Sequence, residues 1–184
     1  MVLTIYTIHH VPAARKGVIL GTSDDPVDPS LRPLFKTQTR GLVLLVSDLI
    51  AKSETSAAAY TSSMRRQKET CEILFSDTSI PIIIDERLRQ IDNGPQYTGM
   101  NFDLGKRDYL AFIDKPFPQG ESFRDFARRV REFLDEKSKQ HREHTIITIG
   151  WRLSPAIFAH VCRGVSLEEA ITDNANISGP FTYG

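Results

Sequence analysis

Two adjacent histidines, His9 and His10, directly follow an apolar run at the start of the chain. Neighbouring residues of a strand point to opposite faces of its sheet, so we expect one of the two imidazoles to enter a cleft. A histidine titrates near neutral pH and can therefore serve as a nucleophile, a base or an acid. The alternative for such a pair is one packed and one solvated histidine, but the position at a strand end favours a functional role for at least one.

Arg65 and Arg66 form a second chemical feature, at the start of an expected helix. A helix N-terminus favours an anion, and a guanidinium beside it can hold a carboxylate or phosphate through two hydrogen bonds. The competing interpretation is that both arginines are solvated or paired with Glu69 or Glu72. Trp151 follows the last expected strand, where it either packs at the rim of a cleft or forms part of its wall.

Apolar periodicity predicts the elements that position these side chains. Strands are expected over residues 2–8, 57–60, 81–85 and 145–149, and helices over 35–50, 61–75, 122–134, 154–162 and 167–171. Strands that are apolar on both faces and alternate with helices indicate an α/β fold, a three-layer α/β/α sandwich with a mainly parallel central sheet. The ligand site of such a sheet lies beyond the carboxyl ends of its strands, so His10, Arg66 and Trp151 should meet there.

Residues 87–121 show no helical or strand period and contain several glycines and prolines. An irregular segment of this length inside a compact domain is usually a functional loop. We therefore expect it to form a cap, or lid, over the site. The whole chain, residues 1–184, is expected to be one domain without linkers or repeats.

Composition excludes several classes of protein. The 184 residues include 23 Lys and Arg and 23 Asp and Glu, so the formal charge is zero and no nucleic-acid surface is expected. No apolar run approaches the roughly 20 residues needed to span a bilayer, and residues 1–10 lack the basic start of a secretory signal. Cys71 and Cys162 predict neither a disulfide scaffold nor a metal site. We expect a cytoplasmic protein with no metal, cofactor or membrane partner, and leave a homodimer open.

Four short motifs, taken in order, resemble the histidine phosphatase superfamily, whose fold is also called phosphoglycerate-mutase-like. Residues 61–70 (TSSMRRQKET) resemble the family's S-S-P-L-x-R-A-x-x-T, and residues 87–94 (RLRQIDNG) resemble R-L-x-E-x-x-x-G. Residues 118–122 (PQGES) are similar to P-x-G-E-S, and residues 174–178 (NANIS) to N-x-S followed by Ile or Val. The likeness spans nearly the whole chain and implies the same three-layer fold.

The resemblance implies a catalytic site that this sequence keeps only in part. The family uses a nucleophilic histidine in an R-H-G turn, an arginine from the S-S-P-L helix, a second histidine in an S-H-G turn, and an acid from R-L-x-E. Aligned on these motifs, His10 keeps the nucleophile and Arg66 the helix arginine, whereas His9 replaces the arginine of the first turn. Gln90 stands in place of the acid, and Gly150 in place of the second histidine.

Some side chains could compensate for these losses. Lys16 falls near a phosphate-contacting position of the family, and Asp92 or Glu121 could supply an acid. The loss of charged anchors and of the acid should still lower phosphoryl-transfer rates by many orders of magnitude. The change to Gly150 is expected to open space beside Trp151, which would then line an enlarged and more apolar pocket.

Three functions compete on this basis. The first is non-phosphoryl acid–base chemistry on a small anionic metabolite, with His10, His9 and Arg66 as the catalytic groups of an atypical, hydrolase-like enzyme. The second is a weak phosphomonoesterase that uses His10 and Arg66. The third is a pseudoenzyme that binds a ligand or a protein partner through an exposed apolar patch. The sequence favours the first function. The residues expected to bind the metabolite are Lys16, Arg65, Gln90, Gly150 and Trp151.

Overall fold

A computed structural model describes residues 2–52, 57–140 and 145–184. Within those residues, five strands form one sheet in the order β3-β2-β4-β1-β5. Four strands are parallel, and the last runs antiparallel to β1. The strands are β1 (Leu3–His9), β2 (Ala57–Thr61), β3 (Ile82–Ile84), β4 (Thr145–Gly150) and β5 (Phe181–Tyr183).

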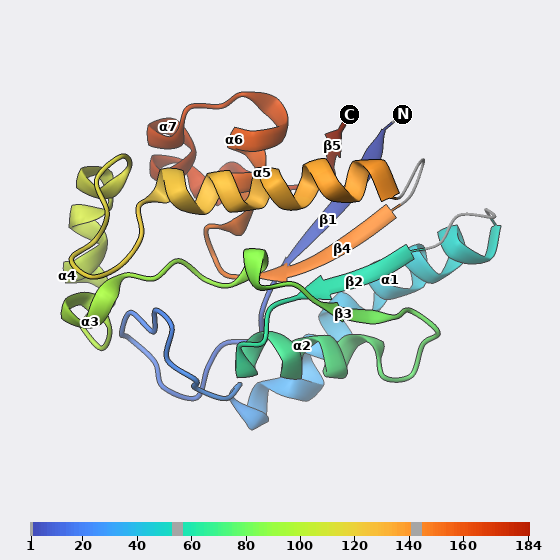
Figure 1. Cartoon of the computed structure of the whole chain (residues 1–184). Helices are drawn as coiled ribbons and strands as arrows, with labels where there is room; N and C mark the ends of the chain where they lie inside the picture. The colour runs from blue at the N-terminus through green and yellow to red at the C-terminus, as the bar shows by residue number, and fades with distance from the viewer. Residues whose placement is uncertain (1, 53–56, 141–144) are drawn as a thin grey trace.

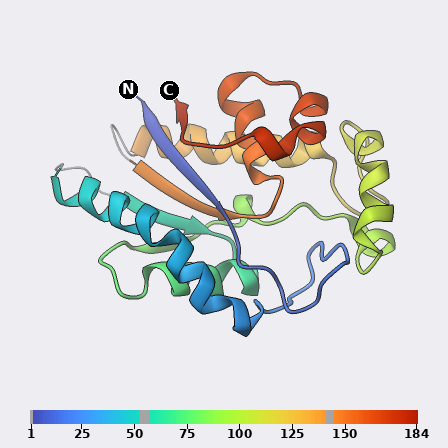
Figure 2. The same ribbon diagram turned by 180° about the vertical axis from the view of Figure 1, so that it is seen from behind.

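Helices cover both faces of this sheet (Figure 1). One face carries α1 (Arg32–Lys52) and α2 (Arg65–Phe75), and the other carries α5 (Phe123–Gln140), α6 (Ser154–Arg163) and α7 (Leu167–Thr172). The arrangement confirms the three-layer α/β/α sandwich with a mainly parallel sheet. Seen from behind, the two ends of the chain lie side by side, because β5 pairs with β1 (Figure 2).

Alternating side chains give the sheet two apolar cores. Leu3 and Ile5 of β1 belong to the core beneath α5 and α6, whereas Ile8 belongs to the core beneath α2. Successive residues of a strand point to opposite faces, so each inner strand supplies both cores. The three alanines of β2 have a weak preference for strands, yet all are buried at the centre of the sheet. Packing from both layers therefore decides the conformation of β2.

Two elements differ from their sequence-based predictions. Thr61, expected to begin a helix, ends β2, and the helix begins at Arg65. The strand predicted to be buried is an edge strand, in which Ile82, Ile83 and Ile84 are 40%, 38% and 52% exposed. A short run of isoleucines looks the same in a central and an edge strand, because periodicity does not report the neighbours of a strand.

The segment of residues 87–121 contains short helical turns rather than a long element. Figure 1 places it beyond the carboxyl ends of the parallel strands. Ser122 caps α5, which begins at Phe123. The Ser122 hydroxyl accepts the Asp125 N–H at 3.1 Å, and the Asp125 carboxylate accepts the Ser122 N–H at 3.1 Å. The short turns of the chain are η1 (Pro29–Leu31), η2 (Glu86–Leu88), α3 (Gly94–Tyr97), α4 (Phe102–Gly105), η3 (Lys106–Phe112) and η4 (Asn174–Asn176). In the described ranges, no helix has the length and apolar character needed to cross a membrane.

Candidate active site

The turn after β1 holds His10 against the end of β4. The backbone N–H of His10 donates to the carbonyl of Gly150 at 2.9 Å, and the N–H of Val11 donates to the Thr70 hydroxyl of α2 at 3.0 Å. Nδ1 of His10 lies 2.7 Å from the carbonyl oxygen of Val11. A carbonyl oxygen only accepts hydrogen bonds, so Nδ1 carries the proton and Nε2 is the unprotonated nitrogen. His10 thus presents Nε2 as a base or a nucleophile.

Both histidines are uncharged at neutral pH. Burial, together with the neighbouring His9 ring and the Arg66 charge, lowers the pKa of His10 to about 3. His9 is an exposed residue at the end of β1, but partial loss of water around its ring, then the charges of Arg152 and Arg66, still lower its pKa to about 4. The ring centroids are 4.6 Å apart. Neither imidazole therefore supplies positive charge for an anion at neutral pH.

A cavity of about 160 Å³ lies beside these rings, and we call it the histidine cavity. It forms where the ends of β1 and β4 meet the segment 87–121. Among the described residues that line it, Arg152 is the one charged side chain and no carboxyl is present. The lining residues are His9, His10, Val18, Ile19, Leu20, Gln90, Phe102, Tyr109, Trp151, Arg152 and Leu153. A larger hollow of about 330 Å³ lies over α1 and α2 and carries none of the motif residues.

Arg66 lies outside the lining of this cavity and is completely buried. Its guanidinium donates to the carbonyls of Ser23 at 2.6 Å and Gly21 at 2.7 Å, and to the side-chain oxygen of Gln90 at 2.7 Å. Burial lowers the pKa of Arg66 to about 10, so the side chain remains charged at neutral pH. Arg66 thus joins α2 to the loop before α1 and to the segment 87–121 through its two terminal nitrogens. Its buried Nε–H has no partner among the described residues.

Two other predicted binding residues lie apart from the cavity. The Lys16 side chain is 64% exposed and pairs with Asp28 at 2.8 Å. The Arg65 side chain is 54% exposed and pairs with Glu69 at 2.8 Å. This pairing is the alternative that the sequence left open for Arg65. The structure brings together His9, His10, Gln90 and Trp151. In the described part of the chain, no group of three His, Cys, Asp or Glu side chains could hold a metal ion.

Comparison with known proteins assigns the chain to a family. The model of the histidine phosphatase superfamily (branch 1) matches residues 28–176. The chain belongs to this superfamily. It is also 28% identical to the protein named "Putative phosphoserine phosphatase 2" of Hydrogenobacter thermophilus, over 95% of this chain and 87% of that protein.

Solved structures support the same fold for this histidine phosphatase superfamily member. YhfR of Bacillus stearothermophilus superposes with a TM-score of 0.70 at 23% identity, over 93% of this chain and 84% of that chain. Phosphoglycerate mutase of Bacillus anthracis superposes with a TM-score of 0.67 at 18% identity, over 89% of this chain and 81% of that chain. The resemblance found in the motifs is thereby confirmed at the level of family and fold.

Gly150, which the motif resemblance places at the superfamily's second histidine, does not open a pocket. A Cβ built on Gly150 would lie 2.7 Å from the Cβ of Ser154, and closer still to the Ser154 hydroxyl oxygen. That hydroxyl also accepts the backbone N–H of Trp151 at 3.0 Å, which fixes the first turn of α6. The expectation of space at Gly150 is therefore wrong, because the Ser154 side chain of α6 fills the position. Any larger residue there would have to displace Ser154.

Aromatic side chains make the walls of the histidine cavity. Trp151 is 5% exposed, and its indole N–H is buried without a hydrogen-bond partner among the described residues. Phe102, Tyr109 and Arg152 also line the cavity and were absent from the sequence-based list. Arg152 directly follows Trp151 at the end of the same strand, so the argument that identified Trp151 could also have identified Arg152. The two aromatic residues lie in an aperiodic segment, where spacing gives no signal.

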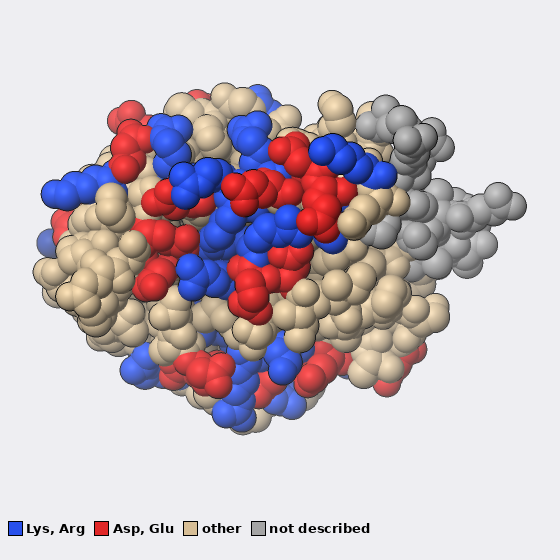
Figure 3. Space-filling model, viewed as in Figure 1, with Lys and Arg blue, Asp and Glu red and all other residues tan. Residues whose placement is uncertain are grey.

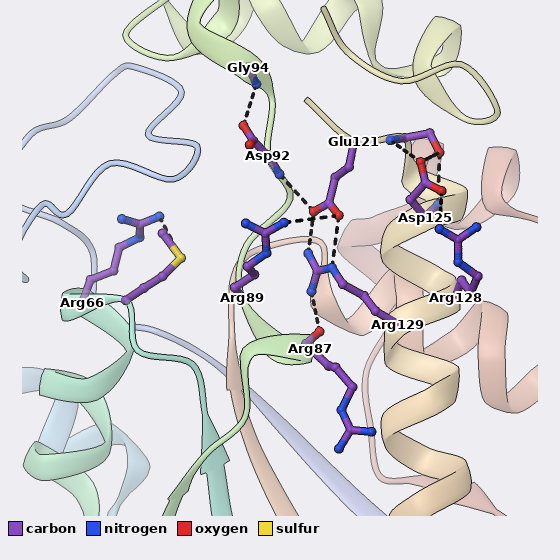
Figure 4. A network of polar contacts seen from close by, with 11 residues as sticks. Arg66, Arg87, Arg89, Asp92, Gly94, Glu121, Asp125, Arg128 and Arg129 are labelled. Carbon is purple, nitrogen blue, oxygen red and sulfur yellow. Dashed lines mark hydrogen bonds and ion pairs between the residues drawn. The ribbon is translucent and has the colours of Figure 1, made fainter. Parts of the chain in front are cut away.

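A charged cluster attaches the segment 87–121 to α5 (Figure 4). The Glu121 carboxylate accepts two hydrogen bonds from Arg129, at 2.6 and 3.2 Å, and one from the Asp92 N–H at 3.1 Å. Arg129 also donates to the carbonyl of Arg87. Figure 3 shows such oppositely charged side chains interleaved over α5. Glu121, considered above as an acid for catalysis, is thus part of an ion pair outside the histidine cavity.

Replacing Arg129 with Ala should lower the free energy of unfolding by about 3 kcal/mol, since it leaves a poorly solvated carboxylate unpaired. The two side chains are 13% and 14% exposed, so water replaces the lost partner only in part. The matched control is Arg128→Ala on the same helix, where Arg128 is 67% exposed and pairs with Asp125. The control should cost about 0–1 kcal/mol. Urea denaturation measures both, and equal losses would contradict an anchoring role for Arg129.

Proposed function

We propose that this protein uses the histidine phosphatase scaffold for non-phosphoryl acid–base chemistry on a small anionic metabolite. His10 is the proton-transfer group, because its Nδ1 contact with the Val11 carbonyl leaves Nε2 unprotonated. The observation that carries the proposal is the charge of the histidine cavity. Two uncharged imidazoles and one guanidinium line it, in a wall that is otherwise mostly apolar.

Such a wall suits a singly charged organic acid better than a phosphate dianion. A desolvated dianion needs several charged partners, and each missing one costs several kcal/mol. Arg66, the superfamily's helix arginine, directs its donors at Gly21, Ser23 and Gln90 instead of at the cavity. Binding a phosphate there would require breaking those bonds.

Uncharged donors are available to hold the oxygen of an enolate. The indole N–H of Trp151 is buried and unpartnered among the described residues, and a buried donor without an acceptor is costly. The side-chain oxygen of Gln90 accepts a hydrogen bond from Arg66, so its amide nitrogen remains as a donor for a ligand. We assign both groups to the oxygen on which negative charge develops as His10 removes a proton from the neighbouring carbon.

The segment 87–121 would act as the lid that selects the metabolite. It supplies Gln90, Phe102 and Tyr109 to the cavity wall, and the Glu121–Arg129 pair fastens it to α5. Closing the site with apolar side chains would exclude water from the proton transfer.

Proton exchange at carbon tests the proposal. The protein is incubated with 2-oxobutanoate in D₂O, and deuterium uptake next to the carbonyl is followed by NMR. We expect uptake above the buffer rate, reduced by about 10²-fold or more in His10→Ala, as for the loss of a general base. The matched control is His160→Ala, since His160 also places Nδ1 2.7 Å from a carbonyl but lies outside the cavity. Equal uptake in the wild type and His10→Ala, with the fold intact by circular dichroism, would contradict the assignment.

A weak phosphomonoesterase is the second candidate function. An unprotonated Nε2 on His10 is also what attack on phosphorus requires, and the relative from Hydrogenobacter thermophilus carries a phosphatase name. Without the acid and with Arg66 engaged, turnover of p-nitrophenyl phosphate should stay well below about 1 per second. Turnover at that level, lost in His10→Ala and kept in His160→Ala, would make this second candidate the better function.

A further inference from the structure

A second hollow adjoins the histidine cavity. It has a volume of about 360 Å³ and lies between η3 and α7. Tyr109, Arg152 and Leu153 line both hollows, so these three side chains form a shared wall. We call the second hollow the arginine groove. Its lining residues are Lys106, Arg107, Tyr109, Leu110, Arg152, Leu153, Ile171, Thr172 and Asn174.

The charges of the arginine groove have one sign. Lys106, Arg107 and Arg152 line it, and none of the described residues that line it is acidic. Carboxylates lie beside the lining: Asp103 pairs with Lys106 at 2.7 Å. Asp108 accepts from the Tyr97 hydroxyl and Asp173 from the Asn176 amide, and both are chain neighbours of lining residues. Hydrogen bonding and the charge of Lys106, with smaller contributions from Arg107 and Arg152, lower the pKa of Asp103. Among the described residues, the side chains that line the groove themselves carry three cations and no anion.

The two guanidiniums of the groove are not engaged as Arg66 is. Within residues 2–52, 57–140 and 145–184, neither the Arg107 nor the Arg152 side chain has a hydrogen-bond or ion-pair partner, and both act on Asp103 only through their charge. Arg152 instead lies over the Phe102 ring, with its Cζ 4.8 Å from the ring centroid. A guanidinium that rests on an aromatic face keeps its N–H groups available for a bidentate contact with a carboxylate or phosphate.

Tyr109 adds an uncharged donor between the two hollows. The residue is 4% exposed, and burial raises the pKa of its hydroxyl to about 12. The hydroxyl therefore keeps its proton at neutral pH and can donate. It lies in the wall that a ligand reaching from the groove to the histidine cavity would cross.

We propose that Arg107 and Arg152 form an anion subsite that holds the charged end of the metabolite, while its uncharged end enters the histidine cavity. The ligand is then an organic acid with an apolar or uncharged body and one terminal carboxylate or phosphate. This inference rests on the proposed function, in which the histidine cavity takes a small anionic metabolite. It moves the anion from Arg66, where the motifs place it, to the rim between η3 and the end of β4.

Three probes of matched shape test the subsite: 3-phenylpropionate, its amide, and 2-phenylethyl phosphate. Binding to the full chain is followed by NMR titration of the backbone amides and of the histidine side chains. The carboxylate should bind about 10- to 100-fold more tightly than the amide, as expected for charge-assisted hydrogen bonds. The phosphate ester then shows which anion the two arginines prefer. Anion affinity should also fall as salt is added.

Variants identify the residues responsible. The double variant Arg107→Gln and Arg152→Gln should bind the carboxylate no more tightly than the amide. Arg128→Gln is the control, because Arg128 is also exposed but pairs with Asp125 on α5. Equal affinity for carboxylate and amide in the wild type would overturn the subsite, and so would a preference that survives in the double variant. A preference without any shift of the His9 or His10 resonances would overturn the claim that one ligand spans both hollows.

The proposed function can fail independently of this subsite. Deuterium exchange depends on His10 and is measured on 2-oxobutanoate, whereas the subsite is measured by affinity on probes that have no exchangeable reaction. Tight, arginine-dependent binding with no His10-dependent exchange would leave the subsite standing and remove acid–base catalysis. His10-dependent exchange without any preference for the anion would support acid–base catalysis and overturn the subsite.

Discussion

Replacing Arg66 with Ala should lower the free energy of unfolding by about 3–5 kcal/mol, the range for breaking a buried charged contact. The guanidinium is completely buried and donates to three acceptors on Gly21, Ser23 and Gln90. Its removal leaves two carbonyls and one amide oxygen without their donor, and creates a cavity. The measurement is urea denaturation at neutral pH, with the transition followed by circular dichroism.

Arg65→Ala is the matched control for this prediction. Arg65 is the preceding residue of the same helix, but its side chain is 54% exposed and, among the described residues, pairs with Glu69 alone. Its replacement should cost about 0–1 kcal/mol. Arg66→Lys should fall between the two, because an ammonium keeps the charge but cannot reach three separated acceptors. If Arg66→Ala unfolds like the wild type but loses affinity for an anion, then Arg66 belongs to the ligand site and its structural role is refuted.

The sequence predicted the position of Arg66 in the fold but not the direction of its side chain. The motif around it and its place at the start of α2 were correctly read as a helix that follows a strand, and the family and fold followed from such motifs. The direction of its side chain depends on the loop that carries Gly21 and Ser23, and this loop has no periodicity that would predict its path. A helix N-terminus suggests an anion, but here the protein's own carbonyl oxygens take the donors.

The strand ends were the predictable part of the candidate site. His10, Gln90 and Trp151 meet because parallel strands and the segment after β3 end at the same edge of the sheet. The prediction of an enlarged pocket at Gly150 was wrong, because the sequence does not show that the Ser154 side chain turns back toward Gly150. Residues such as Tyr109 were missed because their segment has no repeat to interpret. Contacts between side chains far apart in the chain set these features, and local patterns do not encode them.

Acidification should destabilise the folded protein through His10. The ordinary histidine pKa of about 6.5 applies to the unfolded chain, whereas burial lowers the pKa of folded His10 to about 3. Between these values the unfolded state binds the proton and the folded state does not. The stabilisation is therefore complete above pH 6.5 and is lost as the pH falls, by about 1.4 kcal/mol per pH unit.

Comparison with a variant isolates this contribution from those of the carboxyl groups. Urea denaturation of the wild type and of His10→Gln at pH 7, 6.5, 6, 5.5 and 5 gives the difference in unfolding free energy. Between pH 6.5 and pH 5, the wild type should lose about 2 kcal/mol more unfolding free energy than His10→Gln does. His160→Gln, altered on α6 outside the cavity, shows what the loss of any histidine does. A direct NMR titration of the His10 ring should show no protonation down to about pH 4.

The result bears on both candidate functions. An imidazole that stays neutral through the physiological range adds no charge to a phosphate clamp, and with a pKa of about 3 it is a weak base that needs strong stabilisation of the enolate it forms. If His10 instead titrates near pH 6.5 and the stability difference stays flat with pH, the site gains positive charge under mildly acidic conditions. Protonation would then block Nε2 both as a nucleophile and as a base, so turnover of p-nitrophenyl phosphate and deuterium uptake should both fall with pH. The pKa of His10 therefore sets the lower pH limit of either reaction, and comparison of deuterium uptake with phosphate-ester turnover decides between the two.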